Sequence, residues 1–320
     1  MGQQTVGMIS SYPNLNPSAG DWLWNQTPNP FGVWGNIQMV ARDRQPDWLL
    51  MYQFNFPRPP QKQSWLSRLR QKQPAAKVDI LSQLRGVDKE RIIYLLREPP
   101  LDEVVAKNKA IYQEAKHYCG YISGPDRWAP NPGYMPAIWY ISNSFRDLNE
   151  LGAPEKVKAC SWITSGIDRT ANHRQRLAFL RLLQSREVNF DLYGRNLPDW
   201  AQSIGRAGMK WSGMAPYYYN LAIENYAENS WYVSEKLWDA LLAWCLPIYY
   251  GGPAADELLP PGSFLRLPSL DETGLSYIQE VISSPDAWHE ARSAIAEARQ
   301  IVLHKLNLLN WLSDFVGQFS

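Results

Sequence analysis

The segment 219–252 concentrates residues whose types and spacing could bind an anionic ligand. A short apolar run leads to Glu224-Asn225, a polar loop, a helix that starts near Val233, and a second apolar run that ends at Gly251. Two short apolar runs on either side of a helix predict a strand–helix–strand unit with parallel strands and ligands at their carboxyl ends. A ligand site is therefore expected near Glu224, Asn225 and Gly251.

The predicted helix of this unit has a polar start. Ser234 can cap it, and Glu235 and Lys236 fall in its first turn, while the buried stripe comprises Leu237, Ala240, Leu241 and Trp244. Free amide N–H groups and a lysine at a helix start favour an anion. Alternatively, Glu235 only complements the helix dipole and Lys236 is a solvated surface charge.

Glu98 is the candidate general base. It comes after the apolar run RIIYLL at 91–96 and Arg97. Pro99 and Pro100 stiffen the chain where it leaves the predicted strand. A carboxylate fixed at the carboxyl end of a strand can accept a proton from a substrate hydroxyl. The alternative is an ion pair between Glu98 and Arg97 or Arg91, and Glu103 is the second candidate for the base.

A cluster of basic residues surrounds the start of a predicted helix at 170–184. Its members are Arg169, Arg174, Arg176 and Arg181. Such a cluster could cradle an anion, although arginines on a solvated helix face would give the same pattern, and we prefer that interpretation for Arg181.

Motifs for metal or nucleophilic chemistry are absent from the sequence. There is no D-x-D, H-E-x-x-H, G-x-S-x-G or P-loop pattern, and the four histidines are scattered. We therefore expect no metal and no cofactor. In a site without a metal, cationic side chains must stabilise the charge of an anionic ligand or leaving group.

Four consecutive blocks carry a family resemblance. They are Ile223-Glu224-Asn225, the run YVSEKLW at 232–238, PIYYGG at 247–252 and PGSF at 261–264. In order and spacing they resemble the α1,3-fucosyltransferases of glycosyltransferase family 10. The resemblance covers about 157–285 well and the N-terminal half weakly. Ile223 departs from the usual phenylalanine, the loop after Asn225 is one residue longer, and 243–245 replaces a small-residue segment.

The resemblance implies an enzyme that transfers fucose from GDP-fucose, with inversion, to a saccharide hydroxyl, in an α1,3-type linkage. Glu98 would be the base. Donor-binding residues would be Arg176 (with Arg174 as the second candidate), Asn225, Tyr232, Glu235 and Lys236. We expect these three departures from the family pattern to lie near the donor, so the same scaffold could use a different nucleotide sugar. A non-catalytic saccharide- or nucleotide-binding protein is the further alternative, since fold does not fix function.

The length of 320 residues exceeds what one core usually supports, so two domains are expected. Both halves alternate apolar runs with amphipathic helices, which predicts an α/β fold. The resemblance implies two Rossmann-like domains that face a cleft, the glycosyltransferase-B architecture. We predict an acceptor-binding domain at 1–152, a nucleotide-sugar-binding domain at 153–302, and a C-terminal helix at 303–320 that packs back on the first domain.

A long loop at 12–35, rich in Pro, Gly, Asn and Trp, follows the first predicted strand. Such a loop overhangs the carboxyl edge of an open sheet, where substrates bind. Trp22, Trp24 and Trp34 are therefore candidates for stacking on the acceptor. Each could equally plug the loop onto its domain.

Composition excludes several other functions. The net charge is +1 with both signs interspersed, which argues against a nucleic-acid partner bound by a broad basic face. The three distant cysteines, Cys119, Cys160 and Cys245, are expected as buried thiols. No apolar run reaches the length of a membrane span and no signal peptide is evident, so we expect a soluble, cytoplasmic protein, or one peripheral to a membrane where glycans are assembled.

Overall fold

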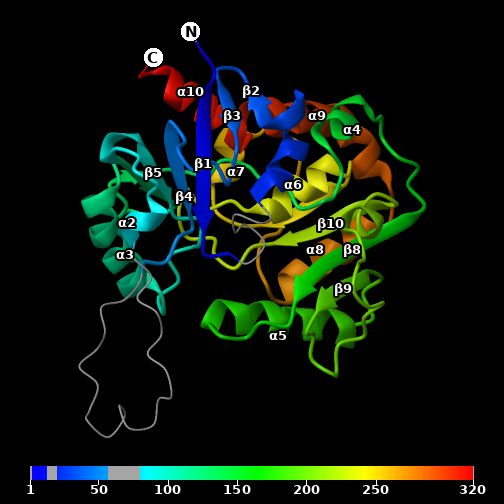
Figure 1. The fold of residues 1–320 in the computed structure, drawn as a ribbon. Coiled ribbons are helices and arrows are strands. Elements are labelled where there is room, and N and C mark those ends of the chain that lie inside the picture. Colours follow the sequence, from blue (N-terminus) through cyan, green and yellow to red (C-terminus); the bar gives the residue numbers. More distant parts are fainter. Residues whose placement is uncertain (1, 13–19, 57–79, 320) are drawn as a thin grey trace, which may run out of the picture.

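The computed structural model describes residues 2–12, 20–56 and 80–319, with the side chains of 20–22 left out. Two parallel β-sheets form the framework, one from each half of the chain (Figure 1). The α/β fold predicted from the alternation of apolar runs and amphipathic helices is confirmed.

The N-terminal sheet has the order β2-β3-β1-β4-β5-β6-β7. Its strands are β1 (Gln4–Ser10), β2 (Val33–Trp34), β3 (Ile37–Met39), β4 (Trp48–Tyr52), β5 (Ile92–Leu95), β6 (Tyr121–Gly124) and β7 (Asn131–Pro132). All neighbouring pairs are parallel except the short hairpin β2–β3. Without the two-residue edges β2 and β7, the strands taken in chain order lie as 2-1-3-4-5, a doubly wound order in which ligands bind where the direction of winding reverses, between β1 and β4.

The C-terminal sheet repeats that order. Its strands are β8 (Lys158–Ser165), β9 (Asp191–Arg195), β10 (Tyr217–Ile223), β11 (Leu246–Tyr250) and β12 (Leu265–Arg266). They lie as β12-β11-β10-β8-β9, and every pair is parallel. The winding reverses between β8 and β10, so the expected ligand position is at the carboxyl ends of these two strands.

Helices connect the strands and cover the sheets (Figure 1). They are α2 (Ile80–Gln83), α3 (Val105–Tyr118), α4 (Phe145–Glu150), α5 (Ala171–Ser185), α6 (Glu235–Leu242), α7 (Ala254–Leu258), α8 (Glu272–Ile282), α9 (Asp286–Gln300) and α10 (Leu308–Gly317). Short 3₁₀ helices occur at Gly20–Gln26, Pro30–Gly32, Lys89–Arg91 and Lys210–Gly213, and a π-helical turn at Ile301–Lys305 joins α9 to α10.

Successive side chains along the strands of the N-terminal sheet point to opposite faces, and each face has its own hydrophobic core. Met8 and Leu50 point into a large cluster on the face covered by α10, whereas Ile9 and Met51 point into a smaller cluster under α3. The large cluster continues into the C-terminal sheet and includes Ile248 of β11. Its continuity joins the two halves of the chain through apolar packing.

The C-terminal helix α10 lies against the N-terminal sheet. Asn307 caps α10, and the chain there pairs with Ala137 in an isolated parallel bridge. Farther along, Ser313 donates to Asn36 and Phe315 contacts the Trp48 ring edge-on. Figure 1 shows α10 beside β2 and β3, close to the N-terminus.

The C-terminal helix predicted at 303–320 overlaps the end of the π-helical turn Ile301–Lys305 and the whole of α10. The hairpin β2–β3 and helix α4 were missed because they interrupt segments rich in loop-forming residues. The three cysteines are buried and free, as predicted. The limits 1–152, 153–302 and 303–320 remain predictions.

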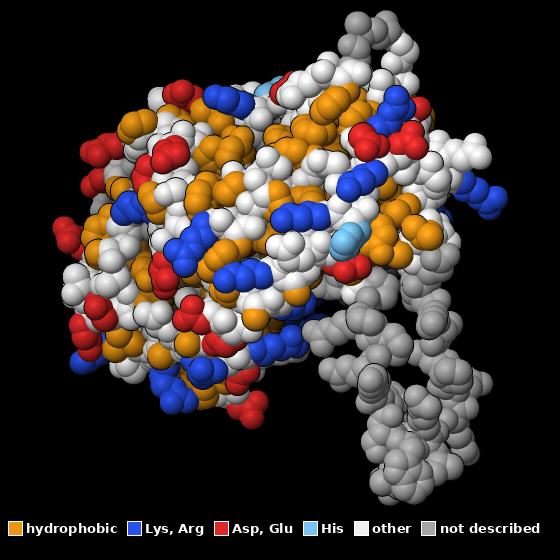
Figure 2. Space-filling model, turned by 90° about the vertical axis from the view of Figure 1, so that its left-hand side faces the viewer, with side chains coloured by type: hydrophobic (Ala, Val, Ile, Leu, Met, Phe, Trp, Pro, Cys, Tyr) orange, Lys and Arg blue, Asp and Glu red, His pale blue; other side chains and the backbone are white. Residues whose placement is uncertain are grey.

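Charge is mixed on the face shown in Figure 2, where basic and acidic side chains are interspersed with apolar atoms. Within the described part of the chain, no helix combines the length and the apolar character needed to cross a membrane.

Candidate active site

A cavity of about 690 Å³ lies where the carboxyl ends of both sheets meet. The N-terminal half supplies the segments after β1 and β5, and the C-terminal half supplies those after β8, β9 and β10. Its described lining residues are Tyr12, Arg97, Glu98, Tyr140, Ile167, His173, Arg195, Gly208, Lys210, Asn225, Tyr232, Glu235 and Lys236. The position is the one that doubly wound sheets use for ligands.

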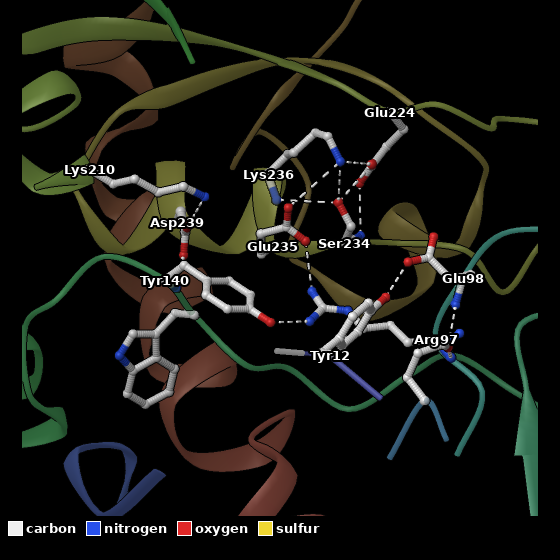
Figure 3. Close-up of polar contacts among 12 residues, drawn as sticks. Tyr12, Arg97, Glu98, Tyr140, Lys210, Glu224, Ser234, Glu235, Lys236 and Asp239 are labelled. Atoms are coloured by element: carbon white, nitrogen blue, oxygen red, sulfur yellow. Dashed lines mark hydrogen bonds and ion pairs between the residues drawn. The ribbon is translucent and has the colours of Figure 1, made fainter. Parts of the chain in front are cut away.

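The start of α6 forms one wall. Ser234 caps the helix, and its N–H and Oγ donate to the two oxygens of Glu224 at 2.8 and 2.7 Å. Lys236 Nζ donates to Glu224 Oε2 and to Ser234 Oγ, both at 3.0 Å (Figure 3). Because the Glu224 side chain is fully buried, these donors satisfy a carboxylate that would otherwise be costly. Lys236 is thereby held at the helix start and is not a loose surface charge.

Glu235 connects the two halves of the chain. Its Oε2 accepts from Arg97 Nη2 at 2.7 Å, and Figure 3 shows the guanidinium between Glu235 and the hydroxyl of Tyr140. Burial acts to raise the pKa of Glu235, but the cations Lys236, Arg97 and Lys210 outweigh it and hold that pKa far below its ordinary value. Glu235 is therefore an anion across the neutral pH range.

Asp239 of α6 makes a second contact between the halves, because its Oδ1 accepts from the backbone N–H of Tyr140 at 2.8 Å. Its Oδ2 accepts from Lys210 Nζ, which belongs to the same half as Asp239, at 2.8 Å. Burial alone would lower the pKa of Lys210, but Asp239 and Glu235 raise it. The amino group thus stays charged beside the cavity, 5.5 Å from the centre of the Tyr140 ring.

Glu98 faces the cavity from the N-terminal side. The hydroxyl of Tyr12, which follows β1, donates to Glu98 Oε1, and the backbone N–H groups of Arg97 and Glu98 both donate to Gln53 Oε1. Gln53 follows β4 and thus fixes the end of the neighbouring β5. Glu98 makes no ion pair with Arg97 or Arg91 among the described residues, because Arg97 is paired with Glu235.

Arg176 is placed behind the cavity rather than in its lining. It is 3 % exposed, and it donates to Asn225 Oδ1 at 2.6 Å and to the backbone oxygens of Ser165 and Ile167 at 2.8 and 3.3 Å. Burial lowers the pKa of its guanidinium to about 10. Arg176 therefore ties the ends of β8 and β10 together at the point where the winding reverses, and it orients Asn225.

Arg195 and His173 also line the cavity, although neither is predicted as a site residue from the sequence. Arg195 ends β9 and is exposed, and its guanidinium has no hydrogen-bond or ion-pair partner in residues 2–12, 20–56 and 80–319. His173 lies in the first turn of α5, where its Nδ1 contacts Thr170 Oγ1 at 2.6 Å.

Of three further residues predicted for the site, two lie outside the cavity lining and one lies within it. Arg174 is exposed and donates to the backbone oxygen of Asp168, and Glu103 accepts from the N–H of Ala171 at the start of α5; neither lines the cavity. Tyr232 does line it and is 6 % exposed.

The tryptophans of the first long loop hold that loop to its domain. Trp24 donates to the Met39 carbonyl, and Trp34 is buried and donates to Asn310 of α10. The prediction that these two rings stack on an acceptor is wrong for this cavity, since neither belongs to its lining. The side chain of Trp22 lies outside the described residues.

The sequence departures at Ile223 and 243–245 also lie away from the cavity. Ile223 is 1 % exposed within β10. Residues 243–245 precede β11, at the opposite edge of the sheet from the carboxyl ends, and Arg299 lies over the Trp244 ring there. The expectation that the departures lie near the donor is therefore not supported for 243–245, whereas the longer loop after Asn225 runs between the lining residues Asn225 and Tyr232.

No set of three or more His, Cys, Asp or Glu side chains suited to a metal ion occurs in the described part of the chain. Among the described residues that line the cavity, four are basic (Arg97, Arg195, Lys210 and Lys236) and two are carboxylates (Glu98 and Glu235). This excess of cations suits an anionic ligand.

Comparisons with known proteins agree with this arrangement. Residues 153–290 match the family described as glycosyltransferase family 10 (fucosyltransferase), C-terminal part. Alpha-(1,3)-fucosyltransferase C of Drosophila melanogaster is 32 % identical over 145 residues, which is 42 % of this chain and 30 % of the relative. The chain thus spans about a third of that relative's length.

Solved structures show the fold. An alpha-glucosyltransferase in complex with UDP and a 13-mer DNA superposes with a TM-score of 0.53 at 9 % identity over 99 % of both chains. An alpha1,3-fucosyltransferase with GDP-fucose gives 0.44 at 15 % identity, covering 91 % of this chain and 81 % of that chain. The two parallel-sheet units accordingly have the glycosyltransferase-B architecture.

The resemblance found in the sequence is confirmed by the family match, which runs from β8 to the start of α9 and contains the α6 wall of the cavity: residues 153–290 are similar to the C-terminal part of glycosyltransferase family 10 (fucosyltransferase).

Proposed function

We propose that this chain is a glycosyltransferase that moves fucose from GDP-fucose to a hydroxyl of a saccharide acceptor, with inversion and in an α1,3-type linkage. The observation that carries the proposal is the placement of Glu98 and the polar start of α6 around one cavity whose described lining holds four basic side chains and two carboxylates. A carboxylate opposite an anion site is what proton removal and diphosphate departure together require.

The donor binds on the C-terminal side. The diphosphate lies at the start of α6, where free N–H groups, Lys236 and the unpaired Arg195 provide positive charge. Glu235 accepts hydrogen bonds from the ribose hydroxyls, because it stays ionised in the cavity. Asn225 and Tyr232 complete the nucleotide pocket.

Arg176 acts through Asn225 in this proposal. The resemblance assigned it direct contact with the diphosphate, but its guanidinium is buried against Asn225 and two backbone oxygens. It is thus a positioning residue that fixes the carboxamide at the end of β10. Arg174 has no role in donor binding here.

The chemical step needs one base and no covalent intermediate. The acceptor oxygen forms a bond to the anomeric carbon of fucose while the bond from that carbon to the β-phosphate oxygen breaks. The electron pair of the broken bond goes to GDP, whose charge the cations stabilise. The acceptor proton passes to Glu98, which is held toward the cavity by Tyr12 and by the Gln53 clamp on its backbone.

Release of GDP from GDP-fucose tests the proposal, with a panel of other nucleotide sugars assayed in parallel. We expect slow hydrolysis alone and faster release when a saccharide acceptor is added. GDP binding without hydrolysis or transfer of fucose would exclude the enzyme and leave a nucleotide-binding protein. Faster turnover of another nucleotide sugar would correct the donor.

A further inference from the structure

A second cavity of about 320 Å³ lies between the two halves of the chain. The N-terminal half contributes Pro100, Asp102 and Val105 near the start of α3, and Asp126, Arg127 and Trp128 after β6. The C-terminal half contributes Tyr226, Glu228, Asn229 and Trp231, from the loop between β10 and α6. The site described above uses none of these residues.

The two cavities share their walls. Glu98 lines the first and Pro100 the second, so the segment after β5 borders both. Likewise, Asn225 and Tyr232 line the first cavity, whereas Tyr226 and Trp231 line the second. A ligand in the second cavity would therefore lie next to the two segments that present the proposed base and the nucleotide pocket.

Aromatic rings dominate the second cavity. Trp231 is half-buried, and no described side chain stacks on its ring or accepts from its indole N–H. Tyr226 touches Tyr232 edge-on at 6.3 Å. Trp128, in contrast, already has Lys109 Nζ and Arg127 Cζ over its ring at 4.4 and 4.8 Å. Trp231 is thus the ring best placed to receive the C–H face of a sugar.

The charge of this cavity is opposite to that of the first. Asp102 and Glu228 are exposed carboxylates in its lining, where Arg127 is the basic residue among those described. Burial raises the pKa of Tyr226, and Glu228 and Asp102 raise it further. Negative potential of this kind opposes a phosphate, sulfate or carboxylate and favours a ligand with neutral hydroxyl donors.

The walls are fixed by hydrogen bonds. Asn229 Nδ2 donates to the Pro125 carbonyl at 2.7 Å, and its Oδ1 accepts from the backbone N–H groups of Trp231 and Tyr232 at 3.0 and 2.9 Å. The loop also packs closely on Gly252, where an added Cβ would lie 2.2 Å from the backbone oxygen of Asn229. Asn229 therefore sets both the entrance between the halves and the position of Trp231.

We propose that this second cavity binds the saccharide acceptor, and that it selects an uncharged sugar unit stacked on Trp231 with its hydroxyls bonded to Asp102 and Glu228. This inference rests on the proposed function, since it adds the acceptor subsite to the same enzyme. It also replaces the tryptophans of the first loop as the source of the stacking ring.

The test uses the full chain and a glycan library in which each neutral oligosaccharide is paired with its sulfated derivative. Direct binding is measured on the immobilised library with GDP present, and transfer is measured with GDP-fucose. We expect neutral members to bind and to accept fucose, and their sulfated partners to be at least about tenfold poorer. Absence of glycan binding, or equal binding of sulfated partners, would overturn the inference.

Variants separate this site from the donor site. Trp231→Ala should raise the acceptor KM at least about tenfold and leave GDP affinity and acceptor-free GDP-fucose hydrolysis unchanged, whereas Trp231→Phe should restore much of the loss. Trp200→Ala is the matched control, because Trp200 is exposed, stacks with Arg181 and lines neither cavity. An unchanged acceptor KM and unchanged glycan binding in Trp231→Ala would reject the site.

Charge selection has its own variant. The double change Asp102→Asn with Glu228→Gln alters two exposed side chains, so folding should persist. It should weaken the discrimination against sulfated glycans, and unchanged discrimination would refute the charge argument. If the wild-type chain neither hydrolyses nor transfers fucose, the proposed function fails, while glycan binding that depends on Trp231 would still identify a saccharide site.

Discussion

Arg97 Nη2 and Glu235 Oε2 lie 2.7 Å apart, although the two residues are 138 positions apart in the sequence and belong to different halves of the chain. One follows β5 and the other opens α6, so the pair spans the cavity where the carboxyl ends of the sheets meet. Their side chains are 11 % and 24 % exposed, which places the pair between a surface and a buried ion pair.

This geometry predicts a measurable coupling between Arg97 and Glu235. In a double-mutant cycle with alanine, the interaction energy from denaturant unfolding should be on the order of 2 kcal/mol, because partial burial limits screening by solvent. The exposed pair Arg146–Glu150, at 79 % and 61 %, is the matched control and should give about 0.3–0.5 kcal/mol. Equal coupling energies in the two cycles would show that the link across the cavity is weak.

Lowering the pH should weaken the ion pair between Arg97 and Glu235. Because the pKa of Glu235 is lowered in the folded chain, its contribution to stability is fully present above the ordinary value of 4.5 and is lost as pH falls toward the folded-state pKa. The free energy of unfolding of Glu235→Gln should therefore fall less steeply below about pH 4.5 than that of the unchanged chain. Glu150→Gln, an exposed control, should follow the unchanged chain. Parallel curves for all three proteins would refute the assignment.

Arg176 and Asn225 should behave as one unit in nucleotide binding. If the guanidinium acts by holding the carboxamide, Arg176→Ala and Asn225→Ala will each weaken GDP affinity, and the double variant will be little worse than either. Calorimetric GDP titration measures all four proteins. Additive losses would mean that Arg176 touches the nucleotide itself, as the family resemblance implied.

Arg195 offers the cleanest test of the anion site, because it is exposed and no partner depends on it in the described part of the chain. Arg195→Ala should weaken GDP binding about tenfold, leave guanosine binding unchanged, and leave the melting temperature unchanged. Arg181→Ala, a basic control on α5, should alter none of these values. A loss of guanosine affinity equal to that for GDP would argue against a diphosphate contact.

Much of this fold follows from local pattern. Parallel strand–helix units, the Ser234 cap and the acidic and basic residues after the strands are all readable from short windows of sequence, so the sequence places Glu98 and Asn225 directly after strands and Glu235 and Lys236 at the start of a helix, where the structure also has them. Resemblance to a family supplied the architecture.

Contacts between distant segments were not predictable in the same way. The pairing of Arg97 with Glu235 and of the Tyr140 backbone with Asp239 depends on how the sheets face each other. The role of Trp34 depends on α10, which returns from the other end of the chain to accept its indole N–H. From sequence alone, a tryptophan-rich loop can serve packing or ligand binding equally well. In the structure, Trp24 and Trp34 pack the loop onto its domain.

Glu98 carries the central claim, because the proposed reaction needs one base and Glu98 is the lining carboxylate not engaged with Arg97. Single-turnover transfer from GDP-fucose, measured together with GDP affinity for Glu98→Gln, tests it most directly. The account predicts transfer slowed by about a hundredfold or more with GDP affinity unchanged, whereas Lys236→Ala should weaken GDP binding. Transfer by Glu98→Gln at the unchanged rate would contradict the account.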